Sequence, residues 1–174
     1  MKKYKKHTIY KNCHRPIFHI PVLKRVKDNH IRKCFRFTDS CRYYLDYGDQ
    51  MGWNKLTGFY IGLLGLFGIR KNSFRFVWRY NPNVDMIEIG AYWYKGGERG
   101  YKVLCRINIG EEYIFDMQIY SDCIVFKVIE DEYTRISFHE LPMEDLRDRS
   151  KYMCGIYFGG NRFAPQRIVI EERK

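Results

Sequence analysis

The sequence FRFVWR, residues 74–79, places two arginines among large apolar side chains with a period of two residues. Successive side chains of a β-strand point to opposite faces of the sheet. Phe74, Phe76 and Trp78 are therefore expected to face a core, and Arg75 and Arg79 the other side. This stretch predicts a strand with one buried face, and it indicates the fold class of the whole chain.

The same alternation recurs between turn residues along the rest of the chain. It predicts further strands over 31–37, 86–94, 101–109, 113–119, 124–128, 136–138, 156–158 and 167–170. The intervening segments are rich in Gly, Asn, Asp and Pro, which suit tight turns. Many short strands at even spacing are typical of antiparallel sandwiches and barrels. We therefore expect an all-β protein, an antiparallel β-sandwich of jelly-roll type with one short helix.

Two segments do not follow the alternation. The stretch from Pro142 to Arg149 is the predicted helix, because Pro142 precedes acidic residues suited to a first helical turn. The apolar run from Leu56 to Ile69 contains four glycines and is shorter than the about 20 residues of a membrane helix. We expect it to form a loop or a short helix over the core.

The chain of 174 residues suits one domain, and its formal net charge is +11. We divide it into a basic N-terminal segment, 1–30, which forms an edge strand or an arm, and a β-sandwich domain, 31–174. Within the first 36 residues Asp28 is the only acid among many lysines and arginines. This charge favours an acidic partner such as nucleic acid, an anionic glycan, a phosphorylated ligand or a membrane surface, although solubility alone also explains it.

The cysteine and histidine patterns do not predict a metal site. The six cysteines form no C-x-x-C pair and the five histidines no H-x-H or H-E-x-x-H motif. We expect reduced thiols, with a disulfide between neighbouring strands left open, and no cofactor. The basic start is not followed by an apolar stretch, so we expect no signal peptide, no transmembrane segment and a cytoplasmic location.

The candidate ligand-binding residues are basic, aromatic and amide side chains on the predicted strands and turns. Arginine binds carboxylate or phosphate with two hydrogen bonds, and tyrosine faces stack on sugar rings or bases. On a concave sheet such residues would line a groove; on a flat one they are an ordinary solvated face. The set is Arg75, Arg79, Tyr92, Tyr94, Arg106, Gln118, Tyr120, Tyr157 and Asn161.

Two loops carry further candidates. The segment from Asp49 to Leu56 has polar groups on both sides of Trp53, which suits either a ligand-facing loop or a tryptophan plug. The segment from Tyr157 to Asn161 contains two glycines that permit unusual backbone angles. It is interpreted first as a structural turn, and second as a rim that presents Tyr157 and Asn161 to a ligand.

The chain resembles a family of small uncharacterised bacterial β-sandwich proteins from about Phe35 onward. The matching stretches are DQMGWNKL, SFRFVWR and YFGGNRFAP, against the patterns D-Q-x-x-W-N-K-L, S-x-R-F-x-W-R and Y-F-G-G-N-x-x-A-P. This family implies no function. The basic first 30 residues match it least.

A weaker resemblance is to concanavalin-like jelly rolls, including alginate-lyase-like polysaccharide lyases. Their motifs R-x-E-x-R, Q-I-H and Y-F-K-A-G are similar in order to residues 75–79, 118–120 and 157–160. This chain has Val77 in place of the motif acid and Tyr120 in place of the histidine. The resemblance implies a concave sheet that holds a sugar chain. Its chemistry is in doubt, because tyrosine with a pKa near 10 is a poor free base.

The leading hypothesis is a non-catalytic binding module for an anionic, hydroxyl-rich ligand, either an acidic sugar or a nucleotide. The first alternative is a lyase-like enzyme using Tyr157, Arg75 and Gln118. The second is a nucleic-acid binder acting through the basic N-terminal segment. The partner is thus an anionic small molecule or glycan, with nucleic acid as the alternative, and the oligomeric state stays open.

Overall fold

The computed structural model describes residues 2–16, 24–62, 69–130, 134–143, 146 and 149–174. Nearly all of its regular structure is β. The strands are β1 (Tyr4–Ile9), β2 (His30–Phe37), β3 (Asn54–Ile61), β4 (Ser73–Asn81), β5 (Met86–Lys95), β6 (Glu98–Ile107), β7 (Glu112–Ile119), β8 (Cys123–Ile129), β9 (Arg135–Pro142), β10 (Lys151–Cys154) and β11 (Ile168–Arg173). Two short helical turns, η1 (Asp39–Cys41) and α1 (Tyr47–Gln50), lie between β2 and β3.

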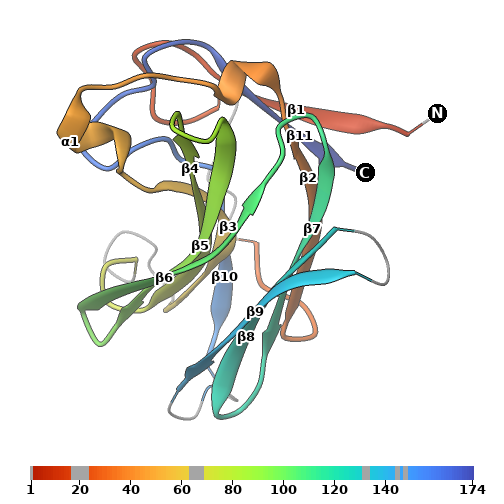
Figure 1. Ribbon diagram of the computed structural model, residues 1–174. Helices are drawn as coiled ribbons and strands as arrows, with labels where there is room; N and C mark the ends of the chain where they lie inside the picture. Colours follow the sequence, from red (N-terminus) through yellow and green to blue (C-terminus); the bar gives the residue numbers. More distant parts are fainter. Residues whose placement is uncertain (1, 17–23, 63–68, 131–133, 144–145, 147–148) are drawn as a thin grey trace.

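The strands form two sheets that face each other (Figure 1). Sheet A has six strands in the order β1-β11-β2-β7-β8-β9, and sheet B has five in the order β10-β3-β4-β5-β6. Every neighbouring pair is antiparallel. The structure therefore confirms the predicted antiparallel β-sandwich.

The core lies between the sheets and is rich in aromatic rings. Phe74, Phe76 and Trp78 of β4 are each 0% exposed, as the alternation predicted. The Phe76 ring packs edge-on against Phe115 of β7 and Phe126 of β8, at centroid distances of 5.3 and 5.2 Å. Edge-to-face pairs of this kind add stability beyond the area they bury. The rings of β4 thus join sheet B to sheet A.

Three local predictions were wrong. The apolar run after Leu56 begins with strand rather than loop or helix: positions 56–60 of β3 are buried on both faces of the sheet, so apolar and polar residues do not alternate there; positions 63–68 of the run lie outside the described residues. Pro142 ends strand β9 instead of starting a helix, and residues 144–145 and 147–148 of the predicted helix are not described. The predicted strand 156–158 makes only a single bridge, from Tyr157 to Lys55.

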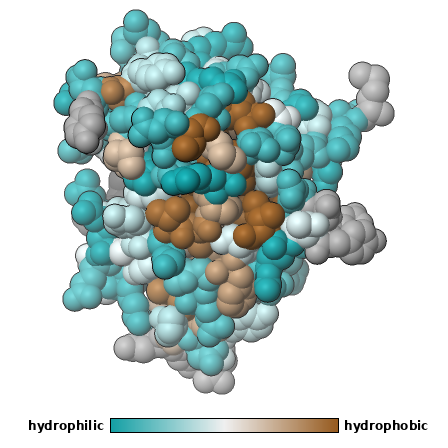
Figure 2. Space-filling view, in the orientation of Figure 1, coloured by the Kyte–Doolittle hydropathy of each residue, from teal (hydrophilic) through white to brown (hydrophobic). Residues whose placement is uncertain are grey.

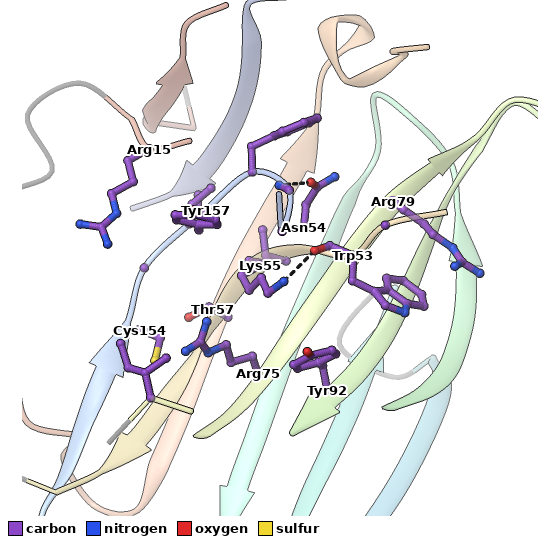
Figure 3. Close-up of a pocket in the computed structure, with 18 of the residues that line it drawn as sticks. Arg15, Trp53, Asn54, Lys55, Thr57, Arg75, Arg79, Tyr92, Cys154 and Tyr157 are labelled. Carbon is purple, nitrogen blue, oxygen red and sulfur yellow. Dashed lines mark hydrogen bonds between the residues drawn. The ribbon is translucent and has the colours of Figure 1, made fainter. Parts of the chain in front are cut away.

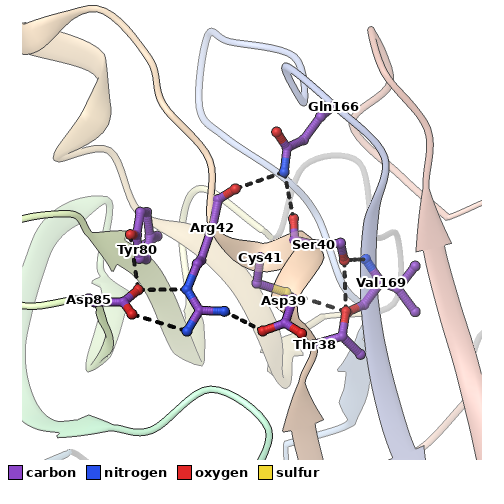
Figure 4. A network of polar contacts seen from close by, with 9 residues as sticks. All are labelled: Thr38, Asp39, Ser40, Cys41, Arg42, Tyr80, Asp85, Gln166 and Val169. Carbon is purple, nitrogen blue, oxygen red and sulfur yellow. Dashed lines mark hydrogen bonds and ion pairs between the residues drawn. The ribbon is translucent and has the colours of Figure 1, made fainter.

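A polar network fixes the connection after β2 (Figure 4). The Arg42 guanidinium binds Asp85 in the β4–β5 turn, with Nε 2.6 Å from Oδ1, and also pairs with Asp39. Gln166 Nε2 donates to the carbonyl oxygens of Ser40 and Arg42 at 3.0 and 2.7 Å. These bonds join η1 to sheet B and to the segment that leads into β11.

The edge strands β6 and β9 lie on the side of the sandwich seen in Figure 1. Figure 2 shows a group of apolar side chains in the middle of this face, surrounded by hydrophilic ones. Leu104 of β6 and Ile136 of β9 are partly buried against the core. Ser137 Oγ donates to the Leu104 carbonyl at 3.0 Å and connects the two edges.

The basic N-terminal residues take part in sheet A. Strand β1 pairs with β11 from Tyr4↔Arg173 to Ile9↔Ile168, at the edge of the sheet. Lys2 pairs with Glu112, and Lys6 approaches Glu171 at 3.8 Å. His7 and Lys33 both bind the Glu172 carboxylate. Part of the basic charge is therefore compensated by acids of β7 and β11.

All six cysteines are free thiols. Among the described residues, no helix is long and apolar enough to cross a membrane.

Glu172 provides a test of these ion pairs. Burial raises the pKa of Glu172, but hydrogen bonds from His7 and Lys33 outweigh it and lower the pKa from 4.5 to about 2. The group therefore stabilises the fold above pH 4.5, and this stability is lost as the pH falls towards 2. Glu172→Gln should lower the free energy of unfolding at pH 7 by about 2 kcal/mol. Urea denaturation at pH 7 and pH 2 should show the difference disappearing at the lower pH.

The matched control is Glu98→Gln, a substitution of an exposed carboxylate at the start of β6. It should change the free energy of unfolding little at either pH. A Glu172→Gln deficit that stayed the same at pH 2 would contradict the electrostatic explanation.

Candidate functional site

A cleft of about 1750 Å³ opens on the face of sheet B that points away from the core. Its floor is formed by side chains of β3, β4, β5 and β6, and its walls by the segments around Trp53 and 155–162 (Figure 3). One end reaches Lys33 and Glu172 of sheet A. The volume exceeds that of an ordinary small-molecule pocket, which is about 300–1,000 Å³.

Strand pairing explains the composition of the floor. Arg75 and Arg79 of β4 lie opposite Tyr92 and Glu88 of β5, and Tyr94 follows two residues after Tyr92. All five face away from the buried rings of β4, as the period of two requires. The predicted shared face of Arg75 and Arg79, and of Tyr92 and Tyr94, is therefore observed.

Trp53 forms one wall and covers part of the sheet. Its side chain packs against Val77 and Tyr92 and is 8% exposed. The Arg79 guanidinium lies 4.1 Å from the Trp53 ring centroid and also binds Glu88, with Nε 2.8 Å from Oε2. Figure 3 shows Arg79 on the far side of Trp53 from Arg75. Trp53 is thus both a plug over the Arg79 end and a wall of the remaining cleft.

The opposite wall is the turn after Tyr157. Gly159 has φ +68°, and an added Cβ would lie 2.0 Å from the Arg162 carbonyl oxygen. Its N–H donates to Asn54 Oδ1 at 2.5 Å, and Asn54 Nδ2 donates to Tyr43 Oη at 2.8 Å. Only glycine fits this position without strain. Asn54, at the start of β3, therefore holds the turn.

Lys55 and Tyr157 form a cross-strand pair inside this wall. Lys55 N donates to the Tyr157 carbonyl at 2.8 Å, and Tyr157 N donates to the Lys55 carbonyl at 3.0 Å. Residues that exchange both bonds in this way place their side chains on the same face. The Tyr157 ring also stacks on His14 at 4.8 Å, with Arg15 5.7 Å from its centroid. The turn thus joins the N-terminal segment to the cleft.

Positive charge dominates the floor. Neither Arg75 nor Arg99 has an ion-pair partner among the residues that the structure describes. Arg75 Nε and Thr57 Oγ1 are buried without a hydrogen-bond partner, although buried polar atoms are normally satisfied. In Figure 3 the Arg75 side chain extends towards Thr57 and Cys154. The floor can therefore still accept an anionic group and hydrogen-bond acceptors.

These surroundings change the protonation of cleft side chains. Burial, and then the charges of Arg75 and Arg99, lower the pKa of Lys55 from 10.5 to about 8. Burial and the neighbouring Tyr94 hydroxyl raise the pKa of Tyr92 to about 12. Burial also raises the pKa of the Cys154 thiol. At neutral pH Lys55 is therefore partly an uncharged amine, whereas Tyr92 and Cys154 keep their protons.

Six of the nine predicted ligand-binding residues line the cleft, and three do not. The six are Arg75, Arg79, Tyr92, Tyr94, Tyr157 and Asn161. Arg106 binds Glu88 at 3.1 Å outside the cleft lining. Gln118 belongs to β7 of sheet A and Tyr120 follows the end of that strand; Tyr120 Oη and Lys127 Nζ donate to Gln118 Oε1 at 2.8 and 2.9 Å. Alternation assigns a face within one strand but not the sheet to which the strand belongs.

The structure also adds residues that the predicted set lacked. Lys55, Arg99, Tyr101, His14 and Arg15 contact the cleft or its walls. Arg99 and Tyr101 alternate along β6 in phase with the cleft face, a signal that the sequence contains. Lys55 gave no such signal, because its strand was not recognised. Among the described residues, no group of three or more His, Cys, Asp or Glu side chains could hold a metal ion.

Comparisons with known proteins agree with this architecture. No family model matches the chain, and no curated protein matches it. Among solved structures, alginate lyase AlyC3 has a TM-score of 0.60 and 12% identity, over 97% of this chain and 72% of AlyC3. AlyC3 in complex with dimannuronate has a TM-score of 0.57 and 11% identity, over 97% of this chain and 71% of AlyC3. The alginate lyase from Klebsiella pneumoniae has a TM-score of 0.54 and 9% identity, over 83% of this chain and 56% of the lyase.

At these identities the similarity establishes the fold alone. It agrees with the weaker of the two resemblances in the sequence, that to concanavalin-like jelly rolls. The Q-I-H correspondence does not hold, since residues 118–120 lie on or beside β7 of sheet A, away from Arg75 and Tyr157.

The pKa of Lys55 predicts a pH-dependent stability. Between pH 8 and 10.5 the unfolded chain binds more protons at Lys55 than the folded protein does, so stability rises with pH across this window. Lys55→Met has no group that titrates there. The melting temperature of Lys55→Met minus that of the native protein should be most positive below pH 8. This difference should decrease towards pH 10.5. Thermal unfolding at pH 7, 8, 9 and 10 measures this difference.

The exposed residue Lys102 of β6 supplies the control. Lys102→Met should show no such trend with pH. An equal trend in both variants would contradict a specific effect of burial at Lys55.

Proposed function

We propose that the protein is a binding module for an acidic glycan, which lies in the cleft of sheet B and is not cleaved there. The observation that carries this proposal is the group Arg75, Arg99 and Lys55, which lines the cleft without a compensating acid among the described residues. Charge-assisted hydrogen bonds to carboxylates are about twice as strong as neutral ones. An anionic ligand would satisfy this group.

The aromatic residues of the cleft favour a sugar over a simple anion. Tyr92 lies between Arg75 and Tyr101 in one row across β4, β5 and β6. Adjacent strands are about 4.8 Å apart, so the row places one cation and then two rings side by side across the floor. Tyr101 is 56% exposed and offers a face for stacking. A sugar chain that crossed the strands along this row would meet the charge of Arg75 and then the rings of Tyr92 and Tyr101.

The structural neighbours add support of the same kind. AlyC3 is an alginate lyase solved with dimannuronate, an acidic sugar, and it shares the sandwich fold with this chain. We propose that the cleft takes a ligand of that chemical class, with Arg75, Tyr92, Tyr94 and Tyr157 among the contacts.

Neither alternative function gains a specific observation. The lyase-like set of Tyr157, Arg75 and Gln118 is divided between two faces of the molecule, because Gln118 lies on sheet A. A free basic arm for nucleic acid does not agree with β1, which is paired along its whole length and has Lys6 close to Glu171. We therefore propose binding without catalysis.

Isothermal titration with oligomannuronate tests the proposal. Arg75→Gln and Arg99→Gln should each weaken binding by about tenfold or more, since a hydrogen bond to a charged group contributes about 1.5–3 kcal/mol. Affinity should also fall as salt rises. The matched control, Lys127→Gln on sheet A, removes the same charge outside the cleft and should leave the affinity unchanged.

Three comparisons complete this experiment. Neutral cello-oligosaccharide should bind much more weakly than oligomannuronate; equal affinity would contradict recognition of the acid. Tighter binding of a nucleotide or oligonucleotide than of any acidic glycan would replace the proposed ligand class. Ultraviolet absorbance from an unsaturated uronate would contradict the non-catalytic part.

A further inference from the structure

Lys55 is a cation of the cleft whose amine is held by contacts with a carbonyl oxygen and an aromatic ring. Its Nζ donates to the Trp53 carbonyl at 2.9 Å and lies 5.1 Å from the centroid of the Tyr92 ring. These contacts hold the amine against the Trp53 wall and over Tyr92 of the floor, and Figure 3 shows Lys55 between Tyr157 and Trp53. No acid pairs with it among the described residues. Lys55 is therefore a positioned amine rather than a member of an ion pair.

An amine in such a place is a nucleophile. Desolvation and neighbouring cations are the two means by which proteins activate lysine for attack on carbonyl groups. Both act on Lys55, through burial and through Arg75 and Arg99. The Cys154 thiol, which also lines the cleft, keeps its proton because burial raises its pKa, so it does not compete.

We propose that Lys55 captures the open-chain aldehyde of an acidic sugar as a reversible imine, with Arg75 and Arg99 holding the acid group of the same ligand. This inference rests on the proposed function in one respect, namely that Arg75 and Arg99 orient the ligand by holding its acid group. It adds a covalent step and a preference for chain ends that carry a free aldehyde.

The step needs no oxidant or reductant. The lone pair of the uncharged Nζ attacks the aldehyde carbon, and the N–C bond forms while the carbonyl oxygen takes a proton. That first proton comes from the amine; the second amine proton then passes to the resulting hydroxyl, the C–O bond breaks and water leaves, so that a C=N bond remains. Tyr157, the cross-strand neighbour of Lys55, faces the same side and can relay a proton to the leaving oxygen. Hydrolysis by water reverses the step.

The charged and titratable groups around Lys55 come from four other parts of the chain. They are Arg75 of β4, Tyr92 of β5, Arg99 of β6 and Tyr157 after β10. Burial raises the pKa of Tyr92 to about 12, so this hydroxyl keeps its proton at working pH values. The titration of Lys55 itself should therefore set the pH dependence of capture.

Trapping with cyanoborohydride tests the proposal, because this hydride donor reduces an imine to a stable secondary amine. The protein is incubated at pH 7.5 with glyoxylate or D-glucuronate as acidic aldehydes, with D-glucose as the neutral one, and its peptides are mapped by mass spectrometry. At this pH the uncharged fraction of Lys55 is roughly two hundred times that of an ordinary lysine. Labelling with the acidic probes should be about tenfold or more faster at Lys55 than at Lys127.

The pH profile and a variant complete the experiment. Labelling of Lys55 should reach half its maximum near pH 8. Lys55→Arg keeps the charge but lacks a nucleophilic amine, so the specific adduct should disappear from a variant whose circular dichroism shows that it is folded. Lys127→Arg should leave the Lys55 adduct unchanged. Equal labelling of Lys55 and Lys127, or equal capture of glucose and glucuronate, overturns the proposal.

A non-reducing ligand separates this inference from the proposed function. Binding of methyl glucuronoside and of oligomannuronate with a reduced end is measured by titration in parallel. If they bind and Lys55 is not labelled, capture fails and the binding function stands. If Lys55 is labelled by glyoxylate but no acidic glycan binds, the reactive amine stands and the glycan proposal fails.

Discussion

The cleft depends on one buried amide, that of Asn54. Its oxygen accepts the Gly159 N–H at 2.5 Å, and its nitrogen donates to Tyr43 Oη in the core. The amide therefore fixes the positions of Gly159 and Tyr43 relative to each other, because leaving either side of a buried amide without its hydrogen bond costs about 1–3 kcal/mol. The neighbouring Lys55 and Tyr157 then pair through their backbones. One residue thus sets the distance between the floor of sheet B and the turn that walls it.

Ion pairs compensate the basic charge of the two sheets at different places. The sheet A acids Glu112, Glu171 and Glu172 pair with Lys2, Lys6 and Lys33. On sheet B the acid Glu88 is used by Arg79 and Arg106. Arg75, Arg99 and Lys55 also belong to sheet B, line the cleft and have no ion-pair partner among the described residues. The net charge of +11 therefore indicates a binding surface only when the positions of the cations in the structure are known.

Much of this architecture could be predicted from alternation, and the failures have physical causes. A period of two assigned Arg75 and Arg79 of β4, and Tyr92 and Tyr94 of β5, to one face each, and the structure places all four along the cleft. Strand β3 is buried on both faces, and its glycines resemble those of a loop; Gly58 instead allows the backbone of β4 to approach, because an added Cβ would lie 2.1 Å from the Phe74 oxygen. Gln118 was misplaced because side-chain parity says nothing about which sheet a strand joins. Lys55 was missed together with its strand.

The two ends of the chain lie side by side, where β1 meets β11 (Figure 1). Tension applied to both ends would load the ladder between these strands one rung at a time, starting at Tyr4↔Arg173, because both ends leave from the same side of an antiparallel pair. Such peeling needs little force compared with sliding all rungs at once. Since His14 follows β1 and stacks on Tyr157, a mechanical pull would reach the mouth of the cleft once the ladder had opened as far as the core residue Ile9.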